Sequence, residues 1–256
     1  MSKSILVIPD VQVKPDTPVD HLRWLGNYIV VKKPDVIVCI GDFADMASLS
    51  SYDVGKKSFE GRRYRADIES SHRAMETLLT PLYTLQHQQA KNKKRVYFPE
   101  MHLTLGNHEN RINRAVNDDP KLDGTIGIED LDYERYGWDV HPFLEVVNLQ
   151  GISFSHYFTT GTMGRPASSA RSQLNSQHSS CVSGHKQGLD IAMGKRADGS
   201  LLTSIIAGSF YLHNEEYLGQ QGNNHFRGCL MLHNCENGSF DLNMLPMKYL
   251  QEKYDF

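Results

Sequence analysis

The chain has 256 residues, of which 39% are hydrophobic and 22% are charged. This composition is typical of a folded protein with a sizeable core and excludes a disordered or fibrous chain. The formal net charge of −3 excludes a protein that binds nucleic acid through its overall charge. No apolar stretch approaches the roughly 18–20 residues that span a bilayer, so we expect no membrane partner.

The cysteines indicate a reducing compartment. None of them forms a C-x-x-C pair, and the first residues lack the apolar core and cleavage site of a secretory signal. We therefore predict reduced thiols in a cytoplasmic protein. The cysteines are Cys39, Cys181, Cys229 and Cys235.

The first forty residues predict a strand, a helix and a second strand. Residues 5–8 are a short apolar run that ends at Pro9, residues 21–33 carry apolar side chains at helical spacing, and residues 36–40 are a second apolar run that ends at Gly41. This order favours a βαβ unit with parallel strands.

Further helices and strands follow. Residues 66–90 predict a long amphipathic helix that Pro81 should kink or divide. Residues 96–98 and 102–105 predict a pair of strands, and a charged helix comes next.

The second half of the chain is rich in short β-like runs separated by Gly, Asn and Asp turns. These runs occupy residues 143–149, 152–156, 180–183, 201–207, 229–234 and 240–245. We predict one α/β domain over residues 1–256, with later strands that are partly antiparallel.

Side chains that can bind a metal follow the apolar runs. In α/β sheets, ligands bind beyond the carboxyl ends of parallel strands. Residues two apart in an extended segment share a face, which would pair Asp10 with Gln12 and His185 with Gln187. Taken singly, each has an ordinary alternative, such as a turn Asp or a core His. The residues are Asp10, Gln12, Asp42, Asn107, His108, His156, His185 and Gln187.

The joint order of these residues resembles the calcineurin-like metallophosphoesterase family. The chain reads D-V-Q, G-D-F-A-D, G-N-H-E, a lone strand-end His and G-H-K-Q between residues 10 and 187. The family pattern is D-x-H, G-D-x-x, G-N-H-[DE], H and G-H-x-H. The resemblance implies two facing mixed β-sheets flanked by helices, the four-layer sandwich of metallo-dependent phosphatases.

The resemblance also implies a site for two divalent metal ions. Asp42 would bridge both ions, and His108 would act beside them as a catalytic residue that protonates the leaving group or stabilises phosphoryl charge. Asp45 or Glu109 would orient His108, although both could equally be cap or surface carboxylates. The second ion would also bind Asn107, His156 and His185, and the first ion would also bind Asp10, Gln12 and Gln187.

Two glutamines depart from the family pattern. Family members carry His at the positions of Gln12 and Gln187, and an amide oxygen favours Mn²⁺ or Mg²⁺ over zinc. We expect Mn²⁺, with Mg²⁺, Ni²⁺, Fe²⁺ and Zn²⁺ as alternatives. The first ion either binds through these amides, binds only together with substrate phosphate, or is absent.

Basic residues suggest where a substrate would bind. Residues 56–65, the basic segment, carry Arg62 and Arg63 among aromatic side chains, which suits a phosphate backbone and stacked bases. A solvated loop that pairs with nearby acids is the alternative. Arg111 would be a phosphate clamp or a structural ion pair, and Arg165, in a glycine-rich stretch, a phosphate contact.

These observations predict a metal-dependent phosphoesterase that hydrolyses phosphodiester bonds through a metal-activated hydroxide. DNA, RNA or a nucleotide is the expected substrate. A phosphomonoesterase, including a protein phosphatase, and a non-catalytic nucleic-acid-binding module with a metal are the alternatives. Residues 40–70 also resemble metallophosphoesterases encoded by bacteriophages, which implies the host cytoplasm. The substrate itself, nuclease polarity and oligomeric state stay open.

Overall fold

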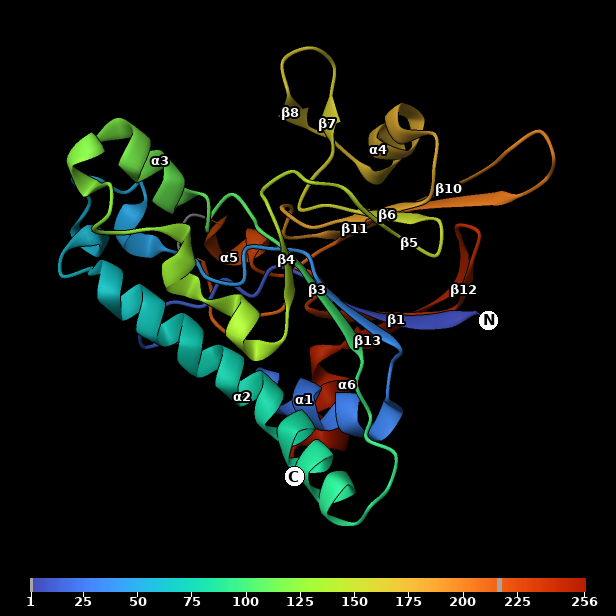
Figure 1. Cartoon of the computed structure of the whole chain (residues 1–256). Coiled ribbons are helices and arrows are strands. Elements are labelled where there is room, and N and C mark those ends of the chain that lie inside the picture. The colour runs from blue at the N-terminus through green and yellow to red at the C-terminus, as the bar shows by residue number, and fades with distance from the viewer. Residues whose placement is uncertain (1, 216–217) are drawn as a thin grey trace.

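Two β-sheets of mixed strand direction face each other in the computed structural model, which describes residues 2–215 and 218–256 (Figure 1). The six-stranded sheet has the order β13-β12-β1-β2-β3-β4, and the five-stranded sheet has the order β10-β11-β9-β6-β5. The six-stranded sheet contains β1 (Lys3–Ile8), β2 (Val36–Cys39), β3 (Glu100–Thr104), β4 (Asp139–His141), β12 (Gly228–Glu236) and β13 (Ser239–Pro246). The five-stranded sheet contains β5 (Val147–Leu149), β6 (Ile152–Phe154), β9 (Cys181–Ser183), β10 (Leu189–Lys195) and β11 (Leu201–Ala207).

Helices and a small hairpin complete the described part of the chain. The hairpin pairs β7 (Thr159–Thr160) with β8 (Arg165–Pro166) and projects from the sheets (Figure 1). The α-helices are α1 (Asp20–Lys32), α2 (Tyr64–Lys91), α3 (Arg111–Asp118), α4 (Ala170–Gln177), α5 (Gly219–Gly222) and α6 (Met247–Tyr254). None of the helices in the described residues combines the length and apolarity needed to cross a bilayer.

Strand β1 contributes side chains to both parts of the core, the part between the sheets and the part between sheet and helices. Ile5 and Val7 pack between the sheets with residues such as Ile205 of β11, whereas Leu6 and Ile8 pack against the helices. A parallel strand buried on both faces needs a continuous apolar run, which is what residues 5–8 provide. Each fully buried side chain of this size contributes about 1.5–3 kcal/mol.

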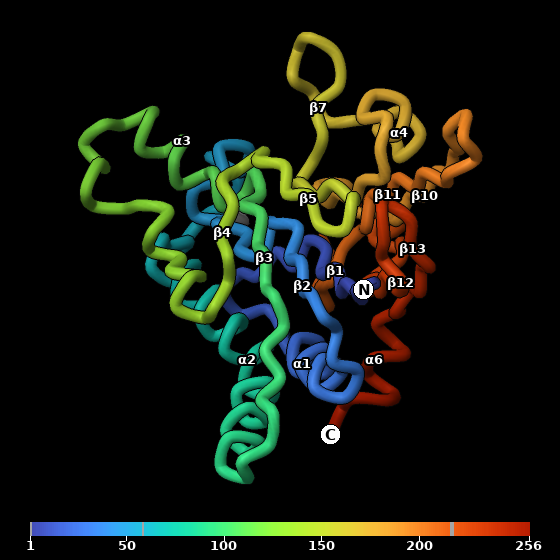
Figure 2. The backbone as a smooth tube through the Cα atoms, turned by 45° about the vertical axis from the view of Figure 1, so that its right-hand side comes forward, coloured from blue at the N-terminus to red at the C-terminus, as the bar shows by residue number. Residues whose placement is uncertain are grey.

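The layers follow from these two faces. Helices α1, α2 and α6 cover the outer face of the six-stranded sheet, and α4 packs on β10 and β11 of the other sheet. Figure 2 shows β4, β3, β2 and β1 side by side in that order, with α1 and α2 beneath them. The predicted sandwich of two mixed sheets between helices is confirmed.

Two strand predictions are wrong, and one helix prediction is wrong in part. Helix α2 runs through Pro81 undivided and packs along α1, and a kink at Pro81 stays a prediction. Residues 96–98 form no strand, since the N–H of Tyr97 donates to the side chain of Gln89 and its hydroxyl donates to Pro34. Residues 143–149 form only the short β5, and the strand that pairs with β3 is β4.

The strand directions decide where polar residues can meet. Strands β1, β2 and β3 are parallel neighbours, and so are β6, β9 and β11. Their carboxyl ends therefore reach one edge of the sandwich, the place where α/β proteins bind ligands.

Candidate metal centre

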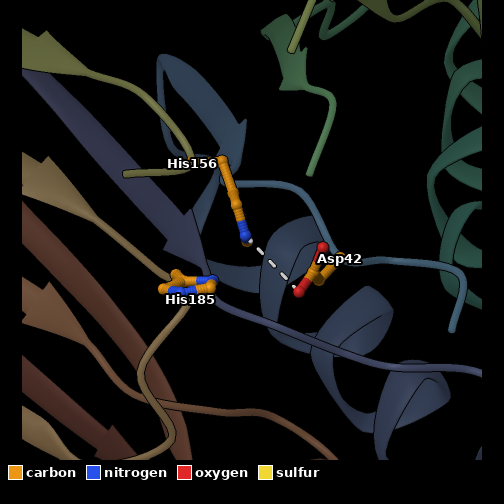
Figure 3. A group of neighbouring side chains, drawn as sticks. All are labelled: Asp42, His156 and His185. Carbon is orange, nitrogen blue, oxygen red and sulfur yellow. Dashed lines mark ion pairs between the residues drawn. The ribbon is translucent and has the colours of Figure 1, made fainter. Parts of the chain in front are cut away.

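Four of the predicted ligands converge beyond these strand ends. Asp42 follows β2, His156 follows β6 and His185 follows β9, and their ligand atoms lie within 4.8 Å of one another. Figure 3 shows these three side chains facing one another from different segments. Asn107, beyond β3, joins them, because its Oδ1 lies 2.9 Å from Nε2 of His156 and 2.7 Å from Nδ1 of His185. We call these four residues the metal centre.

The spacing within the metal centre suits one cation. Oδ2 of Asp42 lies 3.4 Å from Nε2 of His156, and the Asn107 distances are slightly shorter. Ligands at about 2.0–2.1 Å from an octahedral ion lie about 3 Å apart. Two imidazoles, a carboxylate and an amide oxygen therefore fit the second of the two predicted ions.

His156 is held in the tautomer that a metal ligand needs. Its Nδ1 donates to the main-chain oxygen of Ile40 at 2.8 Å, which leaves Nε2 facing Asp42 and Asn107. Burial by itself would lower the pKa of His156, but the carboxylates of Asp42 and Asp10 outweigh burial and raise it to about 9. The site therefore attracts positive charge.

Two predicted ligands of the first ion carry buried oxygens without a partner. Oδ2 of Asp10 and Oε1 of Gln187 accept no hydrogen bond from the described residues. An unsatisfied buried oxygen costs about 1–3 kcal/mol, and a cation beside these two oxygens would offset that cost. Burial raises the pKa of Asp10 in spite of the nearby His156. These two oxygens fit a cation.

The glycines of two motifs make room for the carboxylates. A Cβ on Gly106 would lie 2.1 Å from Oδ1 of Asp42, and a Cβ on Gly184 would lie 2.3 Å from Oδ1 of Asp10. Both distances are far below van der Waals contact, so a larger residue would displace the carboxylate. The first residue of G-N-H-E and of G-H-K-Q is thus set by packing against Asp42 and Asp10.

The backbone is not extended where we expected Asp10 and Gln12, and His185 and Gln187, to share one face. Gln12 has φ 48° and His185 has φ 69°, so neither residue continues a strand. Asp42, with φ 48°, shares this left-handed conformation, which costs about 1–3 kcal/mol and persists where the surroundings impose it. Gln12 is buried, and its main-chain N–H donates to the Asp42 carbonyl at 2.8 Å. Metal binding by Gln12 stays a prediction.

The two carboxylates proposed to orient His108 have different contacts. Oδ1 of Asp45 lies 2.7 Å from Nδ1 of His108. Glu109 instead holds the loops around the metal centre in place. Its carboxylate accepts main-chain N–H groups from Asp42 at 3.0 Å, Ala44 at 2.9 Å and Gly106 at 2.9 Å.

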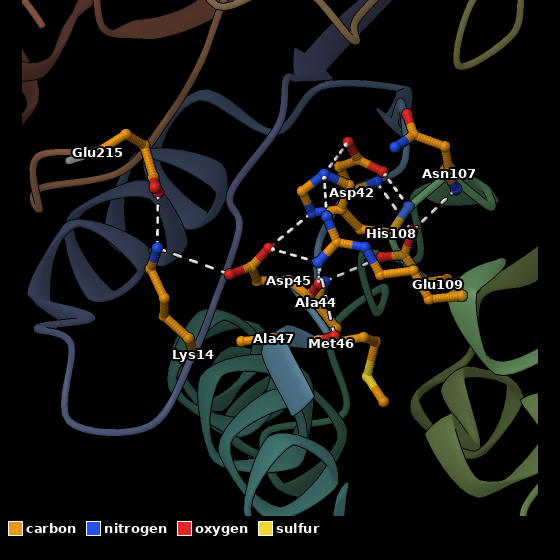
Figure 4. A network of polar contacts seen from close by, with 12 residues as sticks. Lys14, Asp42, Ala44, Asp45, Met46, Ala47, Asn107, His108, Glu109 and Glu215 are labelled. Carbon is orange, nitrogen blue, oxygen red and sulfur yellow. Dashed lines mark hydrogen bonds and ion pairs between the residues drawn. The ribbon is translucent and has the colours of Figure 1, made fainter. Parts of the chain in front are cut away.

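His108 lies within a charged network (Figure 4). Burial would raise the pKa of Asp45, but His108, Lys14 and Arg111 outweigh burial and hold it well below its usual range. Asp45 is thus an ionised acceptor, and Nδ1 of His108 carries the proton. Burial would lower the pKa of His108, and Asp42 and Asp45 raise it instead. Its Nε2 lies 3.7 Å from Oδ2 of Asp42.

Arg111 belongs to this network. One of its nitrogens lies 2.7 Å from the main-chain oxygen of Asp45, and the other lies 3.1 Å from Nε2 of His108. Arg111, Arg114 and Phe59 line a cavity of about 260 Å³. Of the two predicted alternatives for Arg111, the structural ion pair is present, with Asp45 at 3.3 Å, and the phosphate clamp stays a prediction.

The basic segment is largely paired. Arg62 contacts Asp53 at 2.9 Å and the main chain of Ala47, and Arg65 pairs with Glu69 at 3.0 Å. Arg63 donates to the main chain of Arg62. Arg165 is exposed in the β7–β8 hairpin. Substrate binding by Arg62, Arg63, Arg111 and Arg165 stays a prediction.

Sequence reasoning missed two members of the network. Lys14 lies 3.5 Å from Asp45 and 2.7 Å from Glu215, so it connects the loop after β1 with the residues beyond β11. Lys14 lies four residues after Asp10, which is a weak signal. Glu215 has no local signal at all, because only the fold brings it to Lys14.

No family model and no curated protein matches the chain. A conserved uncharacterized protein from Streptococcus pneumoniae TIGR4, described as a predicted phosphoesterase, is similar to it in structure, with a TM-score of 0.40 and 11% identity over 97% of this chain and 91% of that chain. A second solved structure has a TM-score of 0.39 and 13% identity over 96% and 100% of the two chains. Similarities of this size do not decide fold or function.

Proposed function

We propose that the protein is a metal-dependent phosphoesterase of the calcineurin-like type that hydrolyses phosphodiester bonds. The observation that carries this proposal is the convergence of Asp42, Asn107, His156 and His185 beside His108, whose ring is oriented by Asp45. A cluster of metal-binding side chains next to an oriented histidine is better suited to phosphoryl transfer than to a purely structural metal site.

The proposed roles follow from the contacts. Asp42, Asn107, His156 and His185 would hold one divalent ion, and the unpaired oxygens of Asp10 and Gln187, with Asp42, would hold another. Bound ions of this kind polarise phosphoryl oxygens and activate water as a nucleophile.

His108 would supply the proton for the leaving alkoxide. Its Nδ1–H is bound to Asp45, so Nε2 is the atom that faces the metal centre and exchanges a proton with substrate. Arg111 contacts this nitrogen at 3.1 Å and would shift its contact to a substrate phosphate, as a guanidinium binds phosphate in a bidentate way.

A nucleotide or nucleic-acid substrate is favoured by the neighbouring cavity. Phe59 offers a stacking surface, and Arg111 and Arg114 offer positive charge, within one hollow of about 260 Å³. We propose Mn²⁺ as the preferred ion, since the amide oxygens of Gln12 and Gln187 replace imidazoles. Four free, buried cysteines suit a reducing cytoplasm.

Hydrolysis of bis-p-nitrophenyl phosphate with Mn²⁺ tests the proposal. The substitution His108→Ala should lower kcat by about two to four orders of magnitude, because a general acid is lost, while metal content stays unchanged. His87→Gln, on the exposed surface of α2, is the matched control and should retain full activity.

The same assay separates the alternatives. Faster turnover of p-nitrophenyl phosphate than of the diester would favour a phosphomonoesterase. Salt-sensitive DNA or RNA binding without turnover in Mn²⁺, Mg²⁺, Co²⁺, Ni²⁺ or Zn²⁺ would refute the enzyme proposal and favour a binding module.

A further inference from the structure

A second cluster of metal-binding side chains lies on strands β3 and β4, apart from the metal centre. His102 of β3 and Asp139 and His141 of β4 bring their ligand atoms together on one face of the six-stranded sheet. The parallel register places His102 opposite Asp139, with His141 two residues further on. Residues two apart on a strand share a face, so both members of β4 point toward His102.

The three ligand atoms form a triangle of the size that zinc requires. Nδ1 of His102 lies 3.1 Å from Nε2 of His141 and 3.3 Å from Oδ2 of Asp139. The third side, from Nε2 of His141 to Oδ2 of Asp139, is 3.6 Å. In a tetrahedral zinc site with bonds of about 2.0–2.1 Å, neighbouring ligand atoms lie about 3.3–3.4 Å apart. The triangle matches one face of that tetrahedron.

A fourth residue orients one of the histidines. Oε1 of Glu145 lies 3.3 Å from Nδ1 of His141, which places the proton on Nδ1 and leaves the lone pair of Nε2 toward His102 and Asp139. A carboxylate behind a histidine is the usual support of a zinc ligand. The side chains of His102 and His141 are 15% and 12% exposed, so the site is sheltered but reachable from solvent.

We propose that His102, Asp139 and His141 bind a zinc ion at the β4 edge of the six-stranded sheet, with Glu145 orienting His141. Two neutral imidazoles and one carboxylate are a zinc-type ligand set with an open fourth position, which water can fill. This site is additional to the proposed phosphoesterase centre and does not depend on it.

The position of the site indicates what the ion would do. It would join β4, the edge strand of the sheet, to β3 and to the turn that carries Glu145. The same turn carries Phe143, whose ring lies 6.3 Å from that of His156 and 5.6 Å from that of Tyr157. A zinc ion here would fix the segment that packs beside the metal centre.

Zinc content of the full-length protein tests this inference. After equilibration with zinc and gel filtration, His141→Gln and Asp139→Asn should each carry one zinc ion fewer per chain than wild type. Glu145→Gln should keep the ion but bind it about tenfold to hundredfold more weakly. His87→Gln, which replaces an exposed side chain of α2, should match wild type.

Cobalt gives a readout that belongs to this site alone. Asp139→Cys should produce a sulfur-to-cobalt charge-transfer band with Co²⁺, because a thiolate would join two imidazoles, whereas the four native cysteines are buried elsewhere. Asp139 is an exposed side chain, so its substitution should leave the fold intact, as circular dichroism with EDTA would verify.

Two results would overturn the inference. Equal zinc content in wild type and His141→Gln, together with no charge-transfer band in Asp139→Cys, would mean that the histidines only share a proton. Loss of phosphodiester hydrolysis in Asp139→Asn with a zinc content equal to that of wild type would mean that Asp139 serves the metal centre and is not a ligand of a separate site. If wild type itself lacks hydrolysis but zinc content differs as expected, the proposed function fails and the zinc site stands.

Discussion

The surroundings of the metal centre and the basic segment differ in how their polar and charged groups are paired. Beside the metal centre, Asp10 and Gln187 carry buried oxygens that no described residue contacts by a hydrogen bond, and two glycines leave space for carboxylates. In the basic segment, Arg62 and Arg65 are paired with acidic neighbours. Buried groups left unpaired are costly and persist where a ligand completes them, whereas paired surface charges need no further partner. The contrast predicts large effects at the metal centre and small ones in the basic segment.

The largest effect should come from Gly106→Ala. The added Cβ would lie 2.1 Å from Oδ1 and 2.3 Å from the main-chain nitrogen of Asp42, so the carboxylate must move. We expect loss of metal binding and of hydrolysis, with about 1–3 kcal/mol lost from the free energy of unfolding. Metal analysis, turnover and urea unfolding measure this. Gly188→Ala is the matched control, because nothing lies within 4 Å of its Cβ position.

Asp10→Asn should separate metal binding from stability. The metal-free variant should unfold close to wild type, because burial raises the pKa of this carboxyl to about 8 and so keeps it largely uncharged at neutral pH without metal. The variant should lose the rise in Tm that metal produces in wild type, since the cation loses a charged ligand. Thermal unfolding with EDTA and with Mn²⁺ measures both effects. A rise in Tm with Mn²⁺ equal to that of wild type would show that Asp10 does not bind the ion.

His21 provides a buried histidine without carboxylates for comparison with His156. Burial, reinforced by His213, outweighs a weak main-chain interaction with Phe210 and lowers the pKa of His21 to about 3. Below pH 6.5 the unfolded chain binds a proton at His21, whereas the folded chain binds it only near pH 3. Stability therefore decreases as the pH is lowered through this window.

His21→Leu should remove this loss. Between pH 6.5 and 4, the free energy of unfolding of wild type should fall by about 1.4 kcal/mol per pH unit more than that of the variant. Urea unfolding across this range measures the difference. Parallel pH curves would show that His21 becomes protonated in the folded protein, and His87→Gln should follow wild type.

The smallest effect should come from Arg65→Ala in the basic segment. Its pair with Glu69 is exposed and joins residues one helical turn apart, so we expect a change of about 0.3–0.5 kcal/mol in stability and unchanged hydrolysis. A fall in kcat/KM of more than tenfold would place the basic segment in substrate binding after all. Urea unfolding measures the change in stability, and diester turnover measures hydrolysis.

Much of the fold could be predicted from short segments of the sequence. The apolar runs at residues 5–8 and 36–40 became β1 and β2, since strands buried on both faces need uninterrupted apolar residues. Strand β4 was missed, because Asp139–His141 has only 3 residues, too few to show an alternating pattern, and it pairs only with β3.

Candidate ligands were readable because their types and order lie in the chain itself. Their positions after strands predicted one edge of the sheet, where Asp42, Asn107, His156 and His185 do meet. The left-handed backbone at Gln12 and His185 was not readable, because residues beyond β1 and β9 are held by distant segments and not by local propensity.

The amino-acid sequence by itself determined which residues can bind a cation and which runs enter the core, since both are properties of side-chain chemistry and spacing. The tertiary structure alone decided that Asp45 and not Glu109 contacts His108, that Lys14 reaches Glu215, and that His102 meets His141. These contacts join residues far apart in the chain. Pairing of β3 with β4 brings His102 to His141, the loops after β2 and β3 bring Asp45 to His108, and the facing of the two sheets brings Lys14 to Glu215.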